Sequence, residues 1–359
     1  MEKIKVLVVD DSALMRSLIS KMIESQDDMA VTGTAMNGIF ALQKISALNP
    51  DIVILDIEMP EMNGIEFLKE REKRGLKVPV IVLSSIAEKG AKVTFEALSL
   101  GAADFITKPS GSISHNISDV AGQLVSLIRV YTGRKEKPLQ KEAMAEKIAP
   151  VMQVVPPPKL QEVPSLHMSG KIDIVAIGIS TGGPNALRVL LSDIKADFKV
   201  PIVVVQHMPE GFTAEFAKSL TRACPLDVKE AADNDVVTKG RVLIAPGNKH
   251  MRIEKNAMGT VAVINSNPQV NGHRPSAGVL FDSIAETYGN RAMGVIMTGM
   301  GRDGSAEIGK IQKAGGYTIA QDEKSSVVFG MPRVAIELGS INKIVSLDIM
   351  AKYITDYIG

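Results

Sequence analysis

The sequence predicts an α/β protein with two doubly wound, parallel-sheet domains. Buried strand patterns alternate with helical patterns over residues 1–131 and again over residues 171–359. Residues 132–170 differ from both regions, because prolines cluster there among mixed charges without sustained strand periodicity. We therefore expect a semi-rigid linker between the two domains, in which residues 139–149 are compatible with a short helix.

The composition is that of a water-soluble protein. The chain has 359 residues, 45% of them hydrophobic, with 41 basic and 40 acidic side chains, so a large core is available and charge gives no reason to expect a nucleic-acid or membrane partner. Cys224 is the single cysteine, which rules out an intrachain disulfide. The N-terminal apolar run is too short for a signal peptide, and no apolar stretch approaches membrane-spanning length. We expect a cytoplasmic monomer without membrane insertion.

The first region contains four apolar runs that each end in polar residues. The runs cover residues 4–9, 52–55, 80–83 and 104–107, and a helical pattern over 119–131 closes the region. The carboxyl ends of parallel strands form the ligand edge of such a sheet. The polar residues at this edge are Asp10, Asp11, Asp56, Ser84 and Lys108.

Three carboxylates at one edge repel one another unless a cation compensates them. Mg²⁺ suits a small set of carboxylates and retains several waters, and a lysine with a hydroxyl would complement a phosphoryl group. A strand-end acid alone is more often a helix cap. The complete group favours a phosphoryl and magnesium site.

Four motifs resemble the receiver domain of bacterial two-component response regulators, which has a flavodoxin-like fold. They are VVDDS at 8–12, LDIEMPEMNG at 55–64, LSS at 83–85 and DFITKP at 104–109. The resemblance implies that Asp56 accepts a phosphoryl group from a chemotaxis histidine kinase and that Phe105 is the switching aromatic. It implies that Ser84 and Lys108 contact the phosphoryl group. It implies that Mg²⁺ is held by Asp10, Asp11, Asp56 and the backbone carbonyl of Glu58.

The second region is organised around residues 172–184, IDIVAIGISTGGP. An apolar run leads into a turn with Ser180 among glycines, and Pro184 suits the first turn of a helix. Backbone N–H groups at such a helix start favour negative charge. The spacing fits G-x-S-x-G, the pattern of a nucleophile elbow, although a turn of this kind more often cradles a phosphate or only reverses the chain.

The remaining elements of this region follow the same alternation. Strands are predicted at 172–177, 201–206, 226–230, 241–245, 260–264, 293–298 and 317–320. Helices are predicted at 185–194, 212–222, 278–288 and 304–314.

Two further strand ends supply partners for Ser180. His207 follows the strand at 201–206, and Asp303 follows the strand at 293–298, so the three side chains share one edge of the sheet. In a triad, Ser180 attacks a carbonyl, His207 moves the proton and Asp303 orients the imidazole. The order Ser, His, Asp differs from that of α/β-hydrolases, so we reject that fold. The second strand carries no terminal acid for a ribose, which argues against dinucleotide binding.

Each catalytic candidate has a competitor or a simpler role. Thr181 carries a hydroxyl, but its place in the turn suits its backbone N–H to an oxyanion. His250 reads as an ordinary surface histidine, and His273 lies in an irregular stretch rich in side-chain donors. A single histidine at a strand end is more often structural, and Asp303 alone would be a helix cap. The three residues together favour catalysis.

Five further motifs resemble the catalytic domain of chemotaxis protein-glutamate methylesterases, which are also protein-glutamine glutaminases. They are GISTGGP at 178–184, VVQHMP at 204–209, APGNKHM at 245–251, GHRPSAGVLFDS at 272–283 and MTGMGRDG at 297–304. The resemblance implies a Rossmann-like three-layer domain without a cofactor. It implies the triad Ser180, His207 and Asp303, an oxyanion hole at Thr181 and Met300, and a substrate-positioning role for Arg274. Ile179 departs from the alanine that many members carry.

Together the two resemblances imply a phosphorylation-regulated hydrolase. It would demethylate glutamate methyl esters and deamidate glutamines on the cytoplasmic helices of chemoreceptors, with the receiver blocking access until Asp56 is phosphorylated. The alternative is a response regulator with a non-catalytic or DNA-binding output domain. Near-neutral charge and the lack of a basic recognition helix argue against DNA binding.

Overall fold

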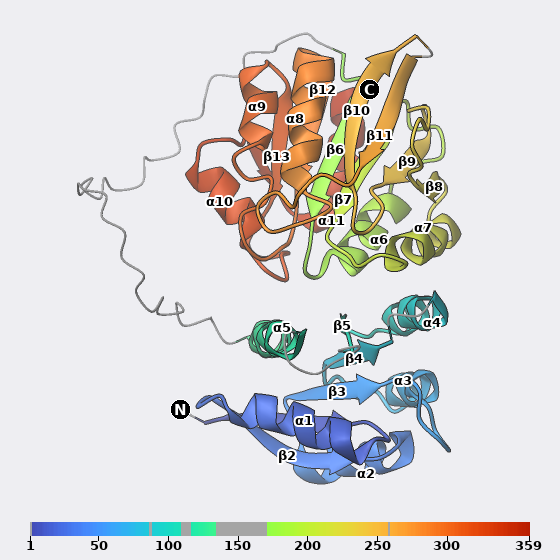
Figure 1. The fold of residues 1–359 in the computed structure, drawn as a ribbon, viewed down its shortest axis with the longest axis vertical. Coiled ribbons are helices and arrows are strands. Elements are labelled where there is room, and N and C mark those ends of the chain that lie inside the picture. Colours follow the sequence, from blue (N-terminus) through green and yellow to red (C-terminus); the bar gives the residue numbers. More distant parts are fainter. Residues whose placement is uncertain (1, 86–87, 109–115, 134–170, 258) are drawn as a thin grey trace, which may run out of the picture.

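The computed structural model describes residues 2–85, 88–108, 116–133, 171–257 and 259–359 (Figure 1). The predicted linker and the short helix at 139–149 lie almost wholly outside the described residues. The two predicted α/β domains are confirmed, and Figure 1 shows them stacked with helices on both faces of each sheet.

The N-terminal domain has a five-stranded parallel sheet in the order β2-β1-β3-β4-β5. Its core strands are continuous apolar runs, as expected of strands that helices cover on both faces. The elements are β1 (Ile4–Val9), α1 (Ala13–Glu24), β2 (Met29–Ala35), α2 (Gly38–Leu48), β3 (Ile52–Asp56), α3 (Gly64–Lys73), β4 (Val80–Ser84), α4 (Glu88–Ser99), β5 (Asp104–Thr107) and α5 (Asn116–Tyr131).

The C-terminal domain has a seven-stranded parallel sheet in the order β14-β13-β12-β6-β7-β9-β8. The order reverses beside β6, so the loops after β6, β7 and β12 adjoin at one edge. The strands are β6 (Ile174–Ile179), β7 (Ile202–Gln206), β8 (Asp227–Glu230), β9 (Arg241–Ile244), β10 (His250–Asn256), β11 (Gly259–Asn265), β12 (Ala292–Ile296), β13 (Tyr317–Gln321) and β14 (Lys343–Val345). The helices are α6 (Gly183–Ser192), α7 (Phe212–Ala223), α8 (Ala277–Tyr288), α9 (Ile308–Lys313), α10 (Met331–Glu337) and α11 (Leu347–Ile358).

Two predicted elements of this domain differ from the structure. β10 and β11 form a separate antiparallel hairpin, whereas only the second of these strands was expected, and it was expected within the main alternation. The helix predicted at 304–314 begins only at Ile308, because Gly304 has a left-handed backbone with φ of 76° and the next residues form turns.

The two domains share a packed interface. Figure 1 shows α4, β5 and α5 on the side of the N-terminal domain that faces α6 and α7. Phe105 stacks on Phe212 with ring centroids 5.1 Å apart, and Phe95 stacks on Phe216 at 5.3 Å. Through these rings, buried apolar residues of both domains join in one cluster, so the centre of the interface is apolar.

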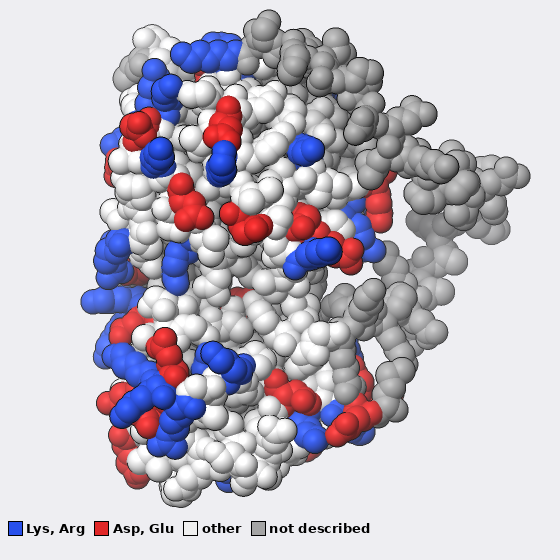
Figure 2. Space-filling model, turned by 180° about the vertical axis from the view of Figure 1, so that it is seen from behind, with Lys and Arg blue, Asp and Glu red and all other residues white. Residues whose placement is uncertain are grey.

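The surface is mixed in charge. On the face in Figure 2, lysine and arginine alternate with aspartate and glutamate over both domains. None of the helices in the described parts of the chain combines the length and apolarity needed to cross a bilayer.

Candidate active site

Ser180 lies in the turn between β6 and α6. Its N–H donates to the Thr298 carbonyl at 3.0 Å, and the Gln206 side-chain amide donates to the Ser180 carbonyl at 2.9 Å. Gly182 adopts φ of 72°, a conformation that favours glycine. Gly299 approaches so closely that an added Cβ would lie 2.8 Å from the Ser180 Cβ. The turn is therefore held rigidly by the neighbouring strand ends.

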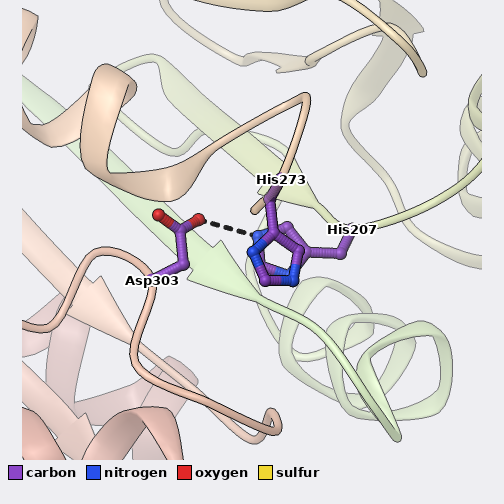
Figure 3. Close-up of side chains that lie close together, drawn as sticks. All are labelled: His207, His273 and Asp303. Atoms are coloured by element: carbon purple, nitrogen blue, oxygen red, sulfur yellow. Dashed lines mark hydrogen bonds and ion pairs between the residues drawn. The ribbon is translucent and has the colours of Figure 1, made fainter. Parts of the chain in front are cut away.

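Ser180, His207 and Asp303 form one hydrogen-bonded chain, as the sequence predicts. The Ser180 Oγ lies 3.1 Å from His207 Nδ1. His207 Nε2 lies 2.8 Å from Asp303 Oδ2 (Figure 3). The ring nitrogens have the opposite assignment to chymotrypsin, where Nδ1 faces the acid. Because a carboxylate only accepts, the proton of neutral His207 lies on Nε2, which leaves Nδ1 free to take the serine proton.

Asp303 is fully buried and surrounded by donors. Besides His207, it accepts hydrogen bonds from the Ser276 hydroxyl at 2.6 Å, the Ala277 N–H at 2.6 Å and the Asn271 side-chain amide at 3.1 Å. Burial alone would raise the pKa of Asp303. The hydrogen bond and electrostatic attraction from His207, with the hydrogen bonds from Ser276 and Asn271, instead lower this pKa to about 2. The carboxylate also lies at the N-terminus of α8, which stabilises negative charge.

Two backbone N–H groups beside Ser180 are available to an oxyanion. Thr181 follows Ser180 in the turn, and Met300 follows Gly299, whose Cα approaches the Ser180 side chain. Within the described residues, neither N–H donates a hydrogen bond to another protein group. Unpaired donors next to a nucleophile are what stabilisation of a tetrahedral oxyanion requires.

The other histidines and Arg274 have defined places. His250 is buried, not a surface residue as expected, and it binds the Pro268 carbonyl and the Ser276 N–H. His273 stacks on His207 with ring centroids 3.9 Å apart. The Arg274 guanidinium binds Asn248 Oδ1 at 2.7 Å and two loop carbonyls, so it braces the loop, and its role toward substrate stays a prediction.

The N-terminal domain brings together the polar residues that the sequence predicts at the edge of its sheet. Carboxylate oxygens of Asp10, Asp11 and Asp56 lie within 4.8 Å of one another. Lys108 Nζ lies 2.8 Å from Asp56 and 3.1 Å from Asp10. Burial raises the pKa of Asp56, and Lys108 partly offsets the rise. Three carboxylates against one lysine leave net negative charge at the site, so the donor set suits Mg²⁺.

Ser84 is buried beside this group, and its hydroxyl is held from α4. Thr94 Oγ1 donates to the Gly90 carbonyl at 2.8 Å and lies 2.6 Å from Ser84 Oγ. Thr94 adjoins Phe95, which packs on the C-terminal domain. A ligand that pulled the Ser84 hydroxyl toward Asp56 would therefore change its contact with Thr94. Thr94 belongs to α4, the helix that packs on the C-terminal domain.

Comparison with known proteins decides the family. The CheB methylesterase family model matches residues 175–354, and the response regulator receiver domain model matches residues 6–115. The chain is 52% identical to the protein-glutamate methylesterase/protein-glutamine glutaminase of Treponema denticola, over 99% of both chains. The chain belongs to this family. Its relative from Pyrococcus horikoshii is 42% identical over 96% of this chain and 91% of that protein.

A solved structure is similar to the C-terminal half of the chain. The CheB methylesterase catalytic domain of Thermotoga maritima is 38% identical and has a TM-score of 0.51, covering 53% of this chain and 99% of that chain. Residues 175–354 are thus a methylesterase-family domain, and residues 6–115 are a receiver domain.

The receiver also touches the turn that carries Ser180 in this methylesterase-family domain. Asp104 Oδ2 lies 3.2 Å from the Gly182 N–H, and the Asn185 side chain lies 3.3 Å from the Ala103 carbonyl. Tyr131 of α5 donates to the same Asp104 carboxylate at 3.2 Å. Burial raises the pKa of Asp104 to about 6, while the N–H donors and Tyr131 oppose the rise. Sequence reasoning did not identify Asp104, because its partner lies 78 positions away.

Proposed function

We propose that this chain is a protein-glutamate methylesterase and protein-glutamine glutaminase that acts on cytoplasmic helices of chemoreceptors. The observation that carries the proposal is the unbroken hydrogen-bonded chain from Ser180 through His207 to Asp303, with free N–H donors beside the serine. The names of the relatives over nearly the full length support the substrate class.

In the first half-reaction, Ser180 Oγ attacks the γ-carbonyl carbon of a glutamate methyl ester while His207 Nδ1 takes the hydroxyl proton. The N–H groups of Thr181 and Met300 stabilise the oxyanion, and buried Asp303 stabilises the imidazolium. When the intermediate collapses, His207 returns the proton to the leaving oxygen. Methanol departs and a glutamyl ester remains on Ser180.

In the second half-reaction, water takes the place of methanol. His207 Nδ1 accepts a proton from this water as its oxygen attacks the glutamyl ester, and the collapsing intermediate returns the proton to Ser180 Oγ. A glutamate carboxylic acid leaves and ionises. Glutamine follows the same route with ammonia as the leaving group, so one site serves both reactions.

Replacement of the nucleophile tests this mechanism. The Ser180→Ala variant should release neither methanol from methylated receptor nor ammonia from its glutamines. The matched control is Ser192→Ala, which changes an exposed serine at the far end of α6, the helix that follows Ser180, and should retain activity. Methanol release by Ser180→Ala at the rate of the control would exclude the mechanism.

We further propose that a chemotaxis histidine kinase phosphorylates Asp56. Asp10, Asp11, Asp56 and the Glu58 carbonyl would hold Mg²⁺, which would offset the charge of an incoming phosphoryl group. Lys108 already lies against Asp56 and would bind the same group, as would Ser84.

Docking of the receiver would hold the enzyme inactive. Its β5 contacts the turn at Gly182, and its aromatic residues pack on α7, so a receptor helix would have to displace it. Phosphorylation would shift the balance toward an undocked form, which requires a differential stability of only a few kcal/mol. The fragment 171–359 should therefore exceed the unphosphorylated whole chain in methanol release, and equal or lower activity would exclude autoinhibition.

A further inference from the structure

In the candidate active site, the ring of His273 stacks on the ring of His207, and the triad alone does not explain this contact. The rings of His207 and His273 are 15° from parallel with centroids 3.9 Å apart, and Figure 3 shows the His273 ring covering one face of His207. Ser180 and Asp303 hold His207 at its two ring nitrogens. Two such points leave the ring free to tilt about the axis that joins them, and a flat ring in contact with its face restricts that tilt.

The protonation of His273 follows from its partner. Its Nδ1 lies 2.8 Å from the Asn271 carbonyl, and a carbonyl only accepts, so Nδ1 carries the proton. Burial lowers the pKa of His273 and the neighbouring His207 lowers it further, against smaller opposing effects of Asn271 and Asp303. His273 is therefore neutral at neutral pH. The π face of a neutral ring attracts a cation, so it suits the imidazolium that His207 becomes during catalysis.

One short loop holds both the acid and the stacked ring. Val270 and His273 exchange two backbone hydrogen bonds of 3.1 and 3.0 Å, which closes the loop. Asn271, at its tip with φ of 54°, donates its side-chain amide to Asp303. Ser276, at the end of the loop, donates to the same carboxylate. The loop thus fixes His273 relative to Asp303, and through Asp303 relative to His207.

The same atoms do not form a metal site, although His207, His273 and Asp303 each place a possible ligand atom within 4.8 Å of the others. The lone pairs of imidazole nitrogens lie in the ring planes. Nearly parallel rings cannot direct these lone pairs to one ion at the short distances that zinc requires, about 2.0–2.1 Å. Stacking and shared metal binding therefore exclude each other here.

We propose that His273 is a positioning residue, whose ring face holds His207 in the plane where Nδ1 meets Ser180 and stabilises the imidazolium that forms. The inference rests on the proposed serine mechanism. For positioning His207, the flat ring of His273 is then the required feature. Neither its hydrogen bond to Asn271 nor a second proton acceptor is required for this role.

Two variants of the full-length protein separate these features. His273→Phe keeps a flat ring and loses the hydrogen bond, whereas His273→Gln keeps a donor for the Asn271 carbonyl and loses the ring. Reactivity of Ser180 is measured as the rate of covalent labelling by a small fluorophosphonate, which does not depend on receptor docking. Methanol release from methylated receptor then gives kcat and KM, and thermal unfolding checks the fold.

We expect His273→Gln to lower the labelling rate and kcat by about 10- to 100-fold, with KM unchanged, because misplacement of a catalytic group by about 1 Å costs on this order. His273→Phe should stay within about threefold of the unchanged protein, because a ring face remains. Equal losses in both variants, or a larger loss in His273→Phe, would overturn the inference. If the unchanged protein itself is not labelled at Ser180, the proposed mechanism fails instead.

Discussion

Removal of the Asp104 carboxylate tests the proposal that the docked receiver inhibits the enzyme. Asp104 Oδ2 accepts from the Gly182 N–H at 3.2 Å, and both residues are buried at the interface. In Asp104→Ala, this N–H loses its acceptor in the docked form, whereas water satisfies it in the undocked form. A buried donor left without a partner costs about 1–3 kcal/mol. The docking constant should therefore fall by roughly 5- to 150-fold.

The assay is methanol release by the unphosphorylated full-length protein, without Mg²⁺ or phosphodonor. Asp104→Ala should raise this basal rate, up to the rate of the fully undocked enzyme. The matched control is Asp27→Ala, which removes an exposed carboxylate from the receiver loop between α1 and β2. Basal activity of Asp104→Ala equal to that of this control, in a protein with unchanged thermal stability, would refute the role of the contact.

Three further predictions concern the same machinery. Asp303→Asn should lower kcat by about 10³- to 10⁴-fold by favouring the wrong tautomer of His207. The control Asp282→Asn, which changes the half-buried acid of an ion pair between α8 and α9, should leave kcat unchanged, and equal activities of the two variants would contradict the triad. Burial raises the pKa of Asp104 to about 6 from an ordinary 3.8, and undocking that exposes this carboxylate would lower its pKa again, so the docked form would bind the proton more tightly. Docking is thus favoured at low pH and weakens as pH rises through the two pKa values, so basal activity relative to Asp104→Asn should increase between about pH 4 and 6; a flat ratio would count against this. Asp56→Asn, or removal of Mg²⁺ by a chelator, should abolish stimulation by a phosphodonor, and persistent stimulation would place the phosphorylated group elsewhere.

Much of both sites was predictable because strand ends converge. Buried runs such as 52–55 and 172–177 are unmistakable in the sequence, and parallel pairing brings the residues that follow them together. Ser180, His207 and Asp303 could therefore be placed at one edge without knowledge of the packing. The left-handed Gly304 could not be foreseen, and the predicted helix after it was four residues too long at its start.

The contacts around these residues were less predictable because they depend on tertiary packing. β10, with the sequence HMRIEKN, forms a strand because it pairs in antiparallel orientation with β11. His250 is buried only because the loop before α8 closes over it. The stacking of His273 on His207 and the bond from Gly182 to Asp104 join residues 66 and 78 positions apart, and no local pattern signals either.

The most direct test of the account is methanol release from methylated chemoreceptor by the intact protein and by Asp56→Asn, each with and without Mg²⁺ and a small phosphodonor. Both proteins should release methanol, and the phosphodonor should stimulate release by the intact protein alone. Release that ignores the phosphodonor would leave the esterase and remove its control by the receiver. No release under any condition would contradict the central claim.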